Sequence, residues 1–299
     1  MISLRAASWL LLLAGAAVGT LSDFPGPRPP IYMGGYRVLQ ADFHLHTFPL
    51  SAGTIAPWDL VWDARRQGLD AIAVSAHNEA WSGRIAAWFQ QRCGGPLVLP
   101  SEEIHGPVYH MIAAGIHSTI SWRLTAAQAI AEIHRQGGVA IAAHPVAPTW
   151  PAYDAAAMSQ LDASEVLHPL AYGDSGQAAS ELREFYARKP MAAIASSDWH
   201  GFTAPGLFRT WVFVHRNTQA EILQAIRDRR TVVYDRGDYF GAPALIELAK
   251  QNANLLAPPP PSPWTPVSGI LAIAGLLGLI AFPRASGQPT SRPRSTRTG

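Results

Sequence analysis

Two histidines one residue apart, His44 and His46, stand at the end of an apolar run that is typical of a β-strand. Side chains two residues apart on a strand point to the same face, so both imidazoles can converge on one point. Neutral imidazole is the commonest metal ligand among protein side chains. The pair therefore indicates half of a metal site, provided that the rest of the chain supplies the other ligands.

Further residues of the ligand type follow other apolar runs, although random placement would scatter them over helices and loops. They are His77, Glu102, Glu103, His110, His144, Asp198 and His200. Nearly every expected strand carries one of them at an end. Nitrogen and oxygen donors of this kind suit zinc, manganese or iron. The pattern therefore predicts a metal site.

Short apolar runs alternate with segments of helical spacing through most of the chain. We expect strands at 38–43, 70–75, 97–99, 108–115, 139–143, 164–167, 191–195, 210–214 and 231–234, and helices at 57–67, 82–92, 125–136, 177–188 and 218–229. This alternation predicts an α/β fold, and the number of repeats fits a TIM-like barrel better than a short open sheet. Such a barrel would bring the strand ends, and the ligand-type residues on them, to one rim.

Taken together, the motifs resemble those of the PHP (polymerase and histidinol phosphatase) family of metal-dependent phosphoesterases. Within residues 38–235 they occur in the family order: Asp42-Phe-His-Leu-His46, Ala76-His-Asn78, Pro100-Ser-Glu-Glu-Ile104, His110, His144-Pro145 and Asp198-Trp-His200. The resemblance implies a distorted (β/α)7 barrel that holds two or three metal ions.

The resemblance also implies a ligand set. One ion would be bound by His44, His46, Glu103 and Asp198, a second by Glu103, His110 and His144, and a third with help from His77 and His200. Ala52 and Ala76 stand where the family often has acidic residues near the third site. We therefore expect two ions and a weak or absent third.

The expected chemistry follows from two cations bridged by a carboxylate, which can hold a hydroxide and lower its pKa toward neutrality. We expect hydrolysis of a phosphate ester by this metal-bridging hydroxide, with Glu103, Asp198 and His200 as the catalytic residues. His77 or His200, where not bound to metal, would orient the phosphate or protonate the leaving oxygen. Two alternatives stay open: another metal-dependent hydrolase of an envelope ester or amide, and a catalytically weak metal-binding module.

Other polar residues lie near the motifs. Arg209, His105 and His168 are expected to contact the substrate, and Glu102 is interpreted as an outer group beside Glu103. Three histidines are not expected to take part in the site: His134 is interpreted as lying on a solvated helix face, and His117 and His215 follow strands but have no counterpart in the motifs.

Composition narrows the possible partners. The formal net charge of the 299 residues is only +2, and no basic patch indicates nucleic-acid binding. A small phosphate ester is the expected partner. The single cysteine, Cys93, excludes an internal disulfide.

Both ends of the chain carry apolar segments next to Pro-rich stretches. We divide the chain into a signal peptide or N-terminal membrane anchor (1–22), a Pro-rich linker (23–35), the PHP-like hydrolase domain (36–255), a second Pro-rich linker (256–266), a transmembrane helix (267–283) and an Arg-rich tail (284–299). The positive-inside rule places Arg5 and the tail in the cytoplasm. The catalytic domain is therefore expected at the cell membrane but outside the cytoplasm, in the periplasm if the cell is Gram-negative.

Overall fold

A computed structural model describes residues 3–22, 29–49, 51–173, 176–201, 203–256 and 262–283. They fall into two compact units, one made by the two ends of the chain and the other, the body, spanning Gly26–Pro259. The tail expected at 284–299 and parts of both expected linkers lie outside the described residues.

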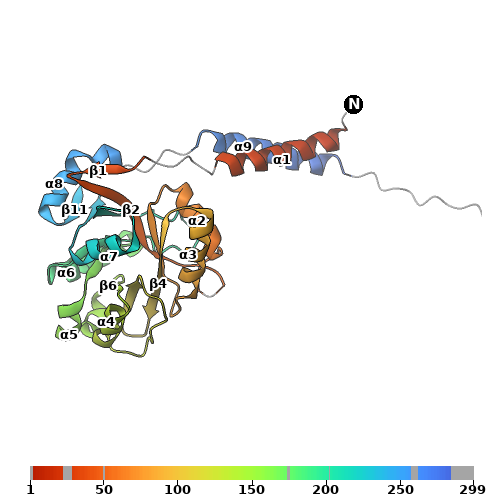
Figure 1. Ribbon diagram of the computed structural model, residues 1–299. Helices are drawn as coiled ribbons and strands as arrows, with labels where there is room; N and C mark the ends of the chain where they lie inside the picture. Colours follow the sequence, from red (N-terminus) through yellow and green to blue (C-terminus); the bar gives the residue numbers. More distant parts are fainter. Residues whose placement is uncertain are drawn as a thin grey trace, which may run out of the picture. The chain divides into compact units, whose positions relative to one another are not determined.

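The body is built on a strongly curved sheet with helices on its outside (Figure 1). Its strands are β1 (Ile31–Met33), β2 (Tyr36–Leu45), β3 (Ala71–Val74), β4 (Leu97–His105), β5 (His110–Ala114), β6 (Val139–Ala142), β7 (Ala163–Leu167), β8 (Ala192–Ala195), β9 (Thr210–Val214), β10 (Thr231–Asp235) and β11 (Asp238–Gly241). Its helices are α2 (Pro57–Arg66), α3 (Trp81–Cys93), α4 (Ala126–Arg135), α5 (Ala155–Gln160), α6 (Gln177–Ala187), α7 (Gln219–Arg227) and α8 (Pro243–Gln251), with short 3-10 turns η1 (Ala147–Ala152), η2 (Pro169–Tyr172) and η3 (Ala253–Leu256).

Strand order explains why the barrel is distorted. Along the sheet the order is β11-β10-β9-β2-β3-β4-β5-β6-β7-β8, with β1 beside β2. The neighbours β2-β3-β4 and β6-β7-β8 are parallel, whereas β5 runs antiparallel to both β4 and β6. The expected distorted TIM-like barrel is confirmed, as a nearly closed sheet.

Apolar side chains fill the barrel and one helix closes its lower end. The short strands β3, β6 and β8 are buried throughout, as expected for parallel strands covered on both faces. Ile222 and Leu223 of α7 join the same buried cluster as the inward residues of the strands. Leu223 lies against Gly115, just after β5, whereas His110 begins that strand at the opposite end. The upper end is therefore left for polar residues.

The ring closes at the carboxyl end of β2. The amide of His46 donates to the carbonyl of Trp199 at 3.0 Å, and the amide of Trp199 donates to the carbonyl of His44 at 3.2 Å. This bridge lies just beyond β8 and joins it to β2. It thereby places the motif around Asp198 directly beside the motif around His44.

Two expected boundaries are wrong for reasons of strand pairing. Strand β4 continues to His105 rather than ending at residue 99, because its second half pairs with β5 in a hairpin. The domain begins before residue 36, because Ile31–Met33 pairs with β2 instead of belonging to a linker. Both pairings are hairpins between consecutive strands, and the apolar period of one short segment does not show where its neighbour pairs with it.

The terminal unit consists of α1 (Leu4–Ser22) and α9 (Trp264–Ala281), and both are long and apolar enough to cross a membrane. The helices pack antiparallel, since Arg5 Nη1 donates to the carbonyl of Phe282 at 2.6 Å (Figure 1). At Gly15 and Gly275 each helix lies so close to the backbone of the other that a Cβ would collide with it. Small residues at such crossings are typical of helix pairs in membranes.

Glu102 provides a test of the packing around β4. It points to the opposite face from Glu103, is fully buried, and its Oε1 accepts from the amide of Ile120 at 2.7 Å. Burial raises the pKa of Glu102 from 4.5 to about 8. The protonated form is therefore favoured by folding, and the stability that it contributes is lost as the pH rises between these two values.

We predict that Glu102→Gln abolishes this pH dependence, since an amide cannot ionise but still accepts from Ile120. The free energy of unfolding of the wild type should fall, relative to the variant, between about pH 5 and about pH 8. Denaturant titrations with a chelator present would measure it, because bound metal would otherwise add stability. A difference between the two proteins that does not change with pH would contradict the prediction.

Candidate metal centre

The carboxylate of Glu103 lies at the middle of a cluster of imidazoles. Its Oε2 is 3.2 Å from His44 Nε2 and 3.0 Å from His77 Nε2. Its Oε1 is 2.9 Å from His110 Nδ1 and 3.4 Å from His144 Nε2. Each oxygen therefore faces its own set of nitrogen donors, which is the arrangement needed for a carboxylate that bridges two cations.

Asp198 completes one side of the cluster. Its Oδ1 lies 3.0 Å from His46 Nε2 and 3.3 Å from His44 Nε2. Its Oδ2 points elsewhere and lies 3.3 Å from His168 Nε2. The two oxygens of Asp198 thus have different neighbours, and only Oδ1 faces the pair of histidines from β2.

Three of the motif residues have left-handed backbone conformations, which are uncommon outside glycine. They are Asn78 (φ 53°), His144 (φ 29°) and Asp198 (φ 43°). Such conformations cost free energy and concentrate at functional sites, where surrounding structure holds them. Here each one lies just past a strand of the barrel, where the chain turns away and its side chain can stay at the rim.

The structure brings all eight expected metal ligands together. Donor atoms lie within 4.8 Å of one another in the groups His44–His46–Asp198, Glu103–His110–His144 and His46–His77–His200. The first group holds three of the four residues expected at the first site, the second group has the residues expected at the second site, and the third contains His77 and His200. That these residues bind metal stays a prediction. Two further groups, His77–Glu103–His105 and His44–His144–His168, add the two histidines that were expected to contact substrate. The histidines that were not expected to take part in the site, His117, His134 and His215, belong to none of these groups in the described part of the chain.

Buried polar atoms show that the residues fit a cation. His44 Nε2, Glu103 Oε1 and His110 Nδ1 are buried and make no well-aligned hydrogen bond within the described ranges. A buried polar atom without a partner is costly and needs an explanation. All three face the donor groups, and their nitrogen and oxygen donors suit zinc, manganese or iron.

The charges in the cluster also favour a cation. Burial acts to lower the pKa of His44, but the carboxylates of Asp198, Glu165 and Glu103 outweigh it and hold this pKa well above its ordinary value. Burial would raise the pKa of Glu103, yet the imidazoles around it hold that pKa well below the usual range. Burial lowers the pKa of His46 to about 4, so this ring is neutral at pH 7, as a metal ligand must be.

Sequence reasoning missed Glu165 on β7. This side chain is fully buried, with Oε1 3.0 Å from His44 Nδ1 and Oε2 accepting from the amide of His144 at 2.6 Å. A carboxylate behind a ligating histidine fixes which ring nitrogen faces the metal. The one signal in the sequence is an acidic residue inside an apolar strand.

Ser51 was also missed as a group that orients ligands. Its Oγ lies 3.1 Å from His46 Nδ1 and accepts from the amide of His77 at 3.1 Å. It stands just before Ala52, where the resemblance led us to look for an acidic residue. A hydroxyl here can orient two histidines but adds no negative charge for a third ion.

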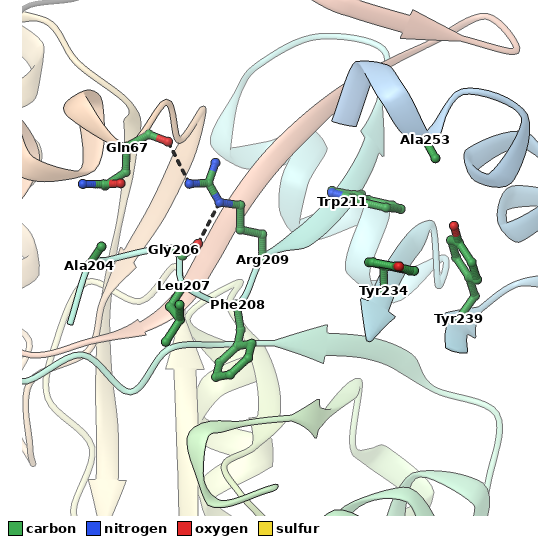
Figure 2. Close-up of a pocket in the computed structure, with 10 residues that line it drawn as sticks. All are labelled: Gln67, Ala204, Gly206, Leu207, Phe208, Arg209, Trp211, Tyr234, Tyr239 and Ala253. Carbon is green, nitrogen blue, oxygen red and sulfur yellow. Dashed lines mark hydrogen bonds between the residues drawn. The ribbon is translucent and has the colours of Figure 1, made fainter. Parts of the chain in front are cut away.

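Arg209 is not brought to the cluster by any of its described hydrogen bonds. Its guanidinium donates to the carbonyl of Gly206 at 2.7 Å, to Gln40 Oε1 at 2.7 Å and to the carbonyl of Gln67 at 2.8 Å. Figure 2 shows it at the wall of a cavity of about 560 Å³ whose other side is aromatic. The lining residues are Gln67, Ala204, Gly206, Leu207, Phe208, Arg209, Trp211, Tyr234, Tyr239 and Ala253. None of them belongs to the donor groups, so this cavity is distinct from the cluster.

Comparison with solved structures supports the barrel fold. The chain is similar in structure to a two-domain protein from Bacteroides vulgatus that contains a predicted PHP-like metal-dependent phosphoesterase, with a TM-score of 0.59, 20% identity, and coverage of 76% of this chain and 74% of that one. The body therefore shares the barrel fold of that protein. The fold implied by the sequence motifs is thereby confirmed.

Other similarities are weaker or less informative. The chain is also similar to PsfC from Pseudomonas syringae, with a TM-score of 0.47 and 19% identity, over 74% of this chain and 99% of that one. An uncharacterized protein from Methanocaldococcus jannaschii is 28% identical over 122 residues, which are 37% of this chain and 70% of the relative. No family model matches the sequence.

We predict that Glu103→Gln removes most of the metal binding, because both donor groups share this charge. The affinity for zinc or manganese should fall by more than about 100-fold, since changes to groups behind the ligands already cost 10–100-fold. Elemental analysis and calorimetric titration of the purified protein would measure it. The matched control is Glu102→Gln, which alters the neighbouring residue on the opposite face of β4. Equal metal loss in both variants would contradict a specific role for Glu103.

Proposed function

We propose that the PHP-like barrel is a metal-dependent phosphoesterase that hydrolyses a small phosphate ester. The observation that supports this most is the carboxylate of Glu103, whose two oxygens face separate donor groups. When bound, two divalent ions would supply Lewis-acid charge at the phosphate and water of lowered pKa. No serine or cysteine nucleophile is then required.

The proposed ligands follow two of the donor groups, with Glu103 shared between them. His44, His46 and Asp198 would hold one ion together with Oε2 of Glu103, which lies 3.2 Å from His44 Nε2, and Glu103, His110 and His144 would hold the second. The group His46–His77–His200 contains no carboxylate. We therefore propose two resident ions of zinc, manganese or iron, and no firm third ion.

The half-exposed histidines at the mouth of the cluster are suited to the substrate. The side chains of His77 and His200 are 29% and 30% exposed. His200 Nδ1 donates to the carbonyl of Asp198 at 2.8 Å, which leaves Nε2 to accept a proton and return it to a leaving oxygen. The Glu103 carboxylate, whose Oε1 lies 3.8 Å from His105 Nδ1, raises the pKa of His105, so this exposed ring more readily carries the positive charge that attracts a phosphate. His105 is thus a proposed substrate contact, whereas Arg209 is not.

We further propose that the protein is anchored in the cell membrane by α1 and α9. The close contacts at Gly15 and Gly275 support an N-terminal helix that is retained as a partner of α9. Their antiparallel packing puts Arg5 and Phe282 at the same end. The positive-inside rule assigns that end to the cytoplasm, and the body to the other side.

Activity should depend on the ligands of the first proposed ion. We predict that full-length protein loaded with manganese or zinc hydrolyses para-nitrophenyl phosphate, and that His44→Ala or Asp198→Ala lowers kcat/KM by about 100-fold or more, since each change removes charge stabilisation at the reacting centre. His117→Ala serves as the control, because this exposed residue belongs to none of the donor groups. Full metal loading without turnover of any phosphate ester would overturn the proposed activity.

The single cysteine allows a test of topology without engineering. Cys93 lies at the exposed end of α3. We predict that a membrane-impermeant maleimide labels it in cells whose outer barrier has been permeabilised but whose inner membrane is intact, and that Cys93→Ser removes the label. Labelling that appears only after the inner membrane is lysed would place the body in the cytoplasm.

A further inference from the structure

His168 lies at the edge of the cluster, just after β7. It is 2% exposed, and its Nε2 points toward Asp198 without a well-aligned hydrogen bond among the described residues. Its donor atom also lies within 4.8 Å of those of His44 and His144. Proximity alone would therefore allow two roles: His168 could bind a metal ion together with His44 and His144, or it could donate a hydrogen bond to Asp198.

The other ring nitrogen decides between these roles. His168 caps the short turn η2, and its Nδ1 accepts from the amide of Leu170 at 3.2 Å. A nitrogen that accepts a hydrogen bond carries no proton, and a neutral imidazole carries its one proton on the other nitrogen. Nε2 of His168 is therefore an N–H group. It has no lone pair to offer a cation.

We propose that His168 is a positioning residue that holds Asp198 as a one-oxygen ligand. This inference rests on the metal-dependent function proposed above. The N–H of His168 lies 3.3 Å from Oδ2 of Asp198, on the side away from the histidines of β2. Oδ1, at 3.0 Å from His46 and 3.3 Å from His44, is left as the oxygen that faces the ion.

The backbone around Asp198 explains why such support is needed. Asp198 has a left-handed conformation, φ 43°, in the segment that leaves the barrel after β8. Its side chain is 24% exposed, far more than the fully buried side chain of His44. A partly exposed carboxylate has room to rotate or to present both oxygens at once. The buried N–H of His168, just after β7, would restrict it to one orientation, much as Glu165 on β7 orients His44.

Two amide substitutions separate the two ring nitrogens. In His168→Asn the amide oxygen reaches only as far as Nδ1, so it can still accept from Leu170 but offers nothing to Asp198. In His168→Gln the amide nitrogen reaches as far as Nε2, so it can still donate to Asp198 while the cap of η2 is lost. The experiment titrates both full-length variants and the wild type with manganese by calorimetry, records the visible spectrum of the cobalt-loaded proteins, and measures their thermal unfolding without metal.

We expect manganese affinity to fall by about 10- to 100-fold in His168→Asn and to stay within about threefold of the wild type in His168→Gln, with unchanged stoichiometry in both. The reverse order, with His168→Gln the weaker binder and the less stable protein, would show that only the cap matters and would overturn the inference. A lower stoichiometry and an altered cobalt spectrum in both variants would make His168 a ligand and would also overturn it.

These outcomes are distinguishable from failure of the proposed function. If the wild type binds two ions and hydrolyses phosphate esters while both variants match it, the positioning role alone is refuted. If the wild type binds no ion, the proposed function is refuted and this inference falls with it.

Discussion

Burying an ionised carboxylate costs free energy unless cations or protonated imidazoles surround it. Glu103 is only 1% exposed, and its neighbours offset this cost. Histidines from β2, from the ends of β3 and β6, and from the start of β5 converge on its two oxygens. An open sheet would spread these segments apart, whereas a barrel gathers them around one strand. The ionisation of Glu103 therefore depends on the curvature of the sheet, because the curvature brings the histidines around it.

The same backbone contacts stabilise the barrel and set the geometry of the cluster. The backbone bridge between Leu45 and Trp199 closes the ring, and it also sets Asp198 beside His44 and His46. Strand β7 contributes Glu165, which lies behind His44 and not among the donor groups found in the described residues. The strained conformations at the rim are tolerated because buried neighbours hold them on several sides. Loss of support at the rim should thus disturb metal binding before it disturbs the fold.

The residues that cluster around Glu103 could be predicted from the sequence because their spacing is local. His44 and His46 occupy one face of a strand through the geometry of that strand alone, and each later motif follows its own apolar run. Arg209 also follows a motif closely, but its guanidinium bonds to Gln40 and Gln67, and no periodicity reveals that. Glu165 was missed for the same reason, since its partners lie on β2 and after β6. Hydrogen bonds that depend on contacts across the barrel, such as those of Arg209 and Glu165, could not be predicted from the sequence.

The raised pKa of His44 links metal loading to the proton balance of the solution. Without an ion, the three carboxylates around it favour the protonated imidazole. A cation that took the Nε2 position would have to displace that proton, so binding of the proposed ion would release acid and be favoured as the pH rises. The apparent affinity for the ion would then depend on the pH of the compartment as well as on the ligands.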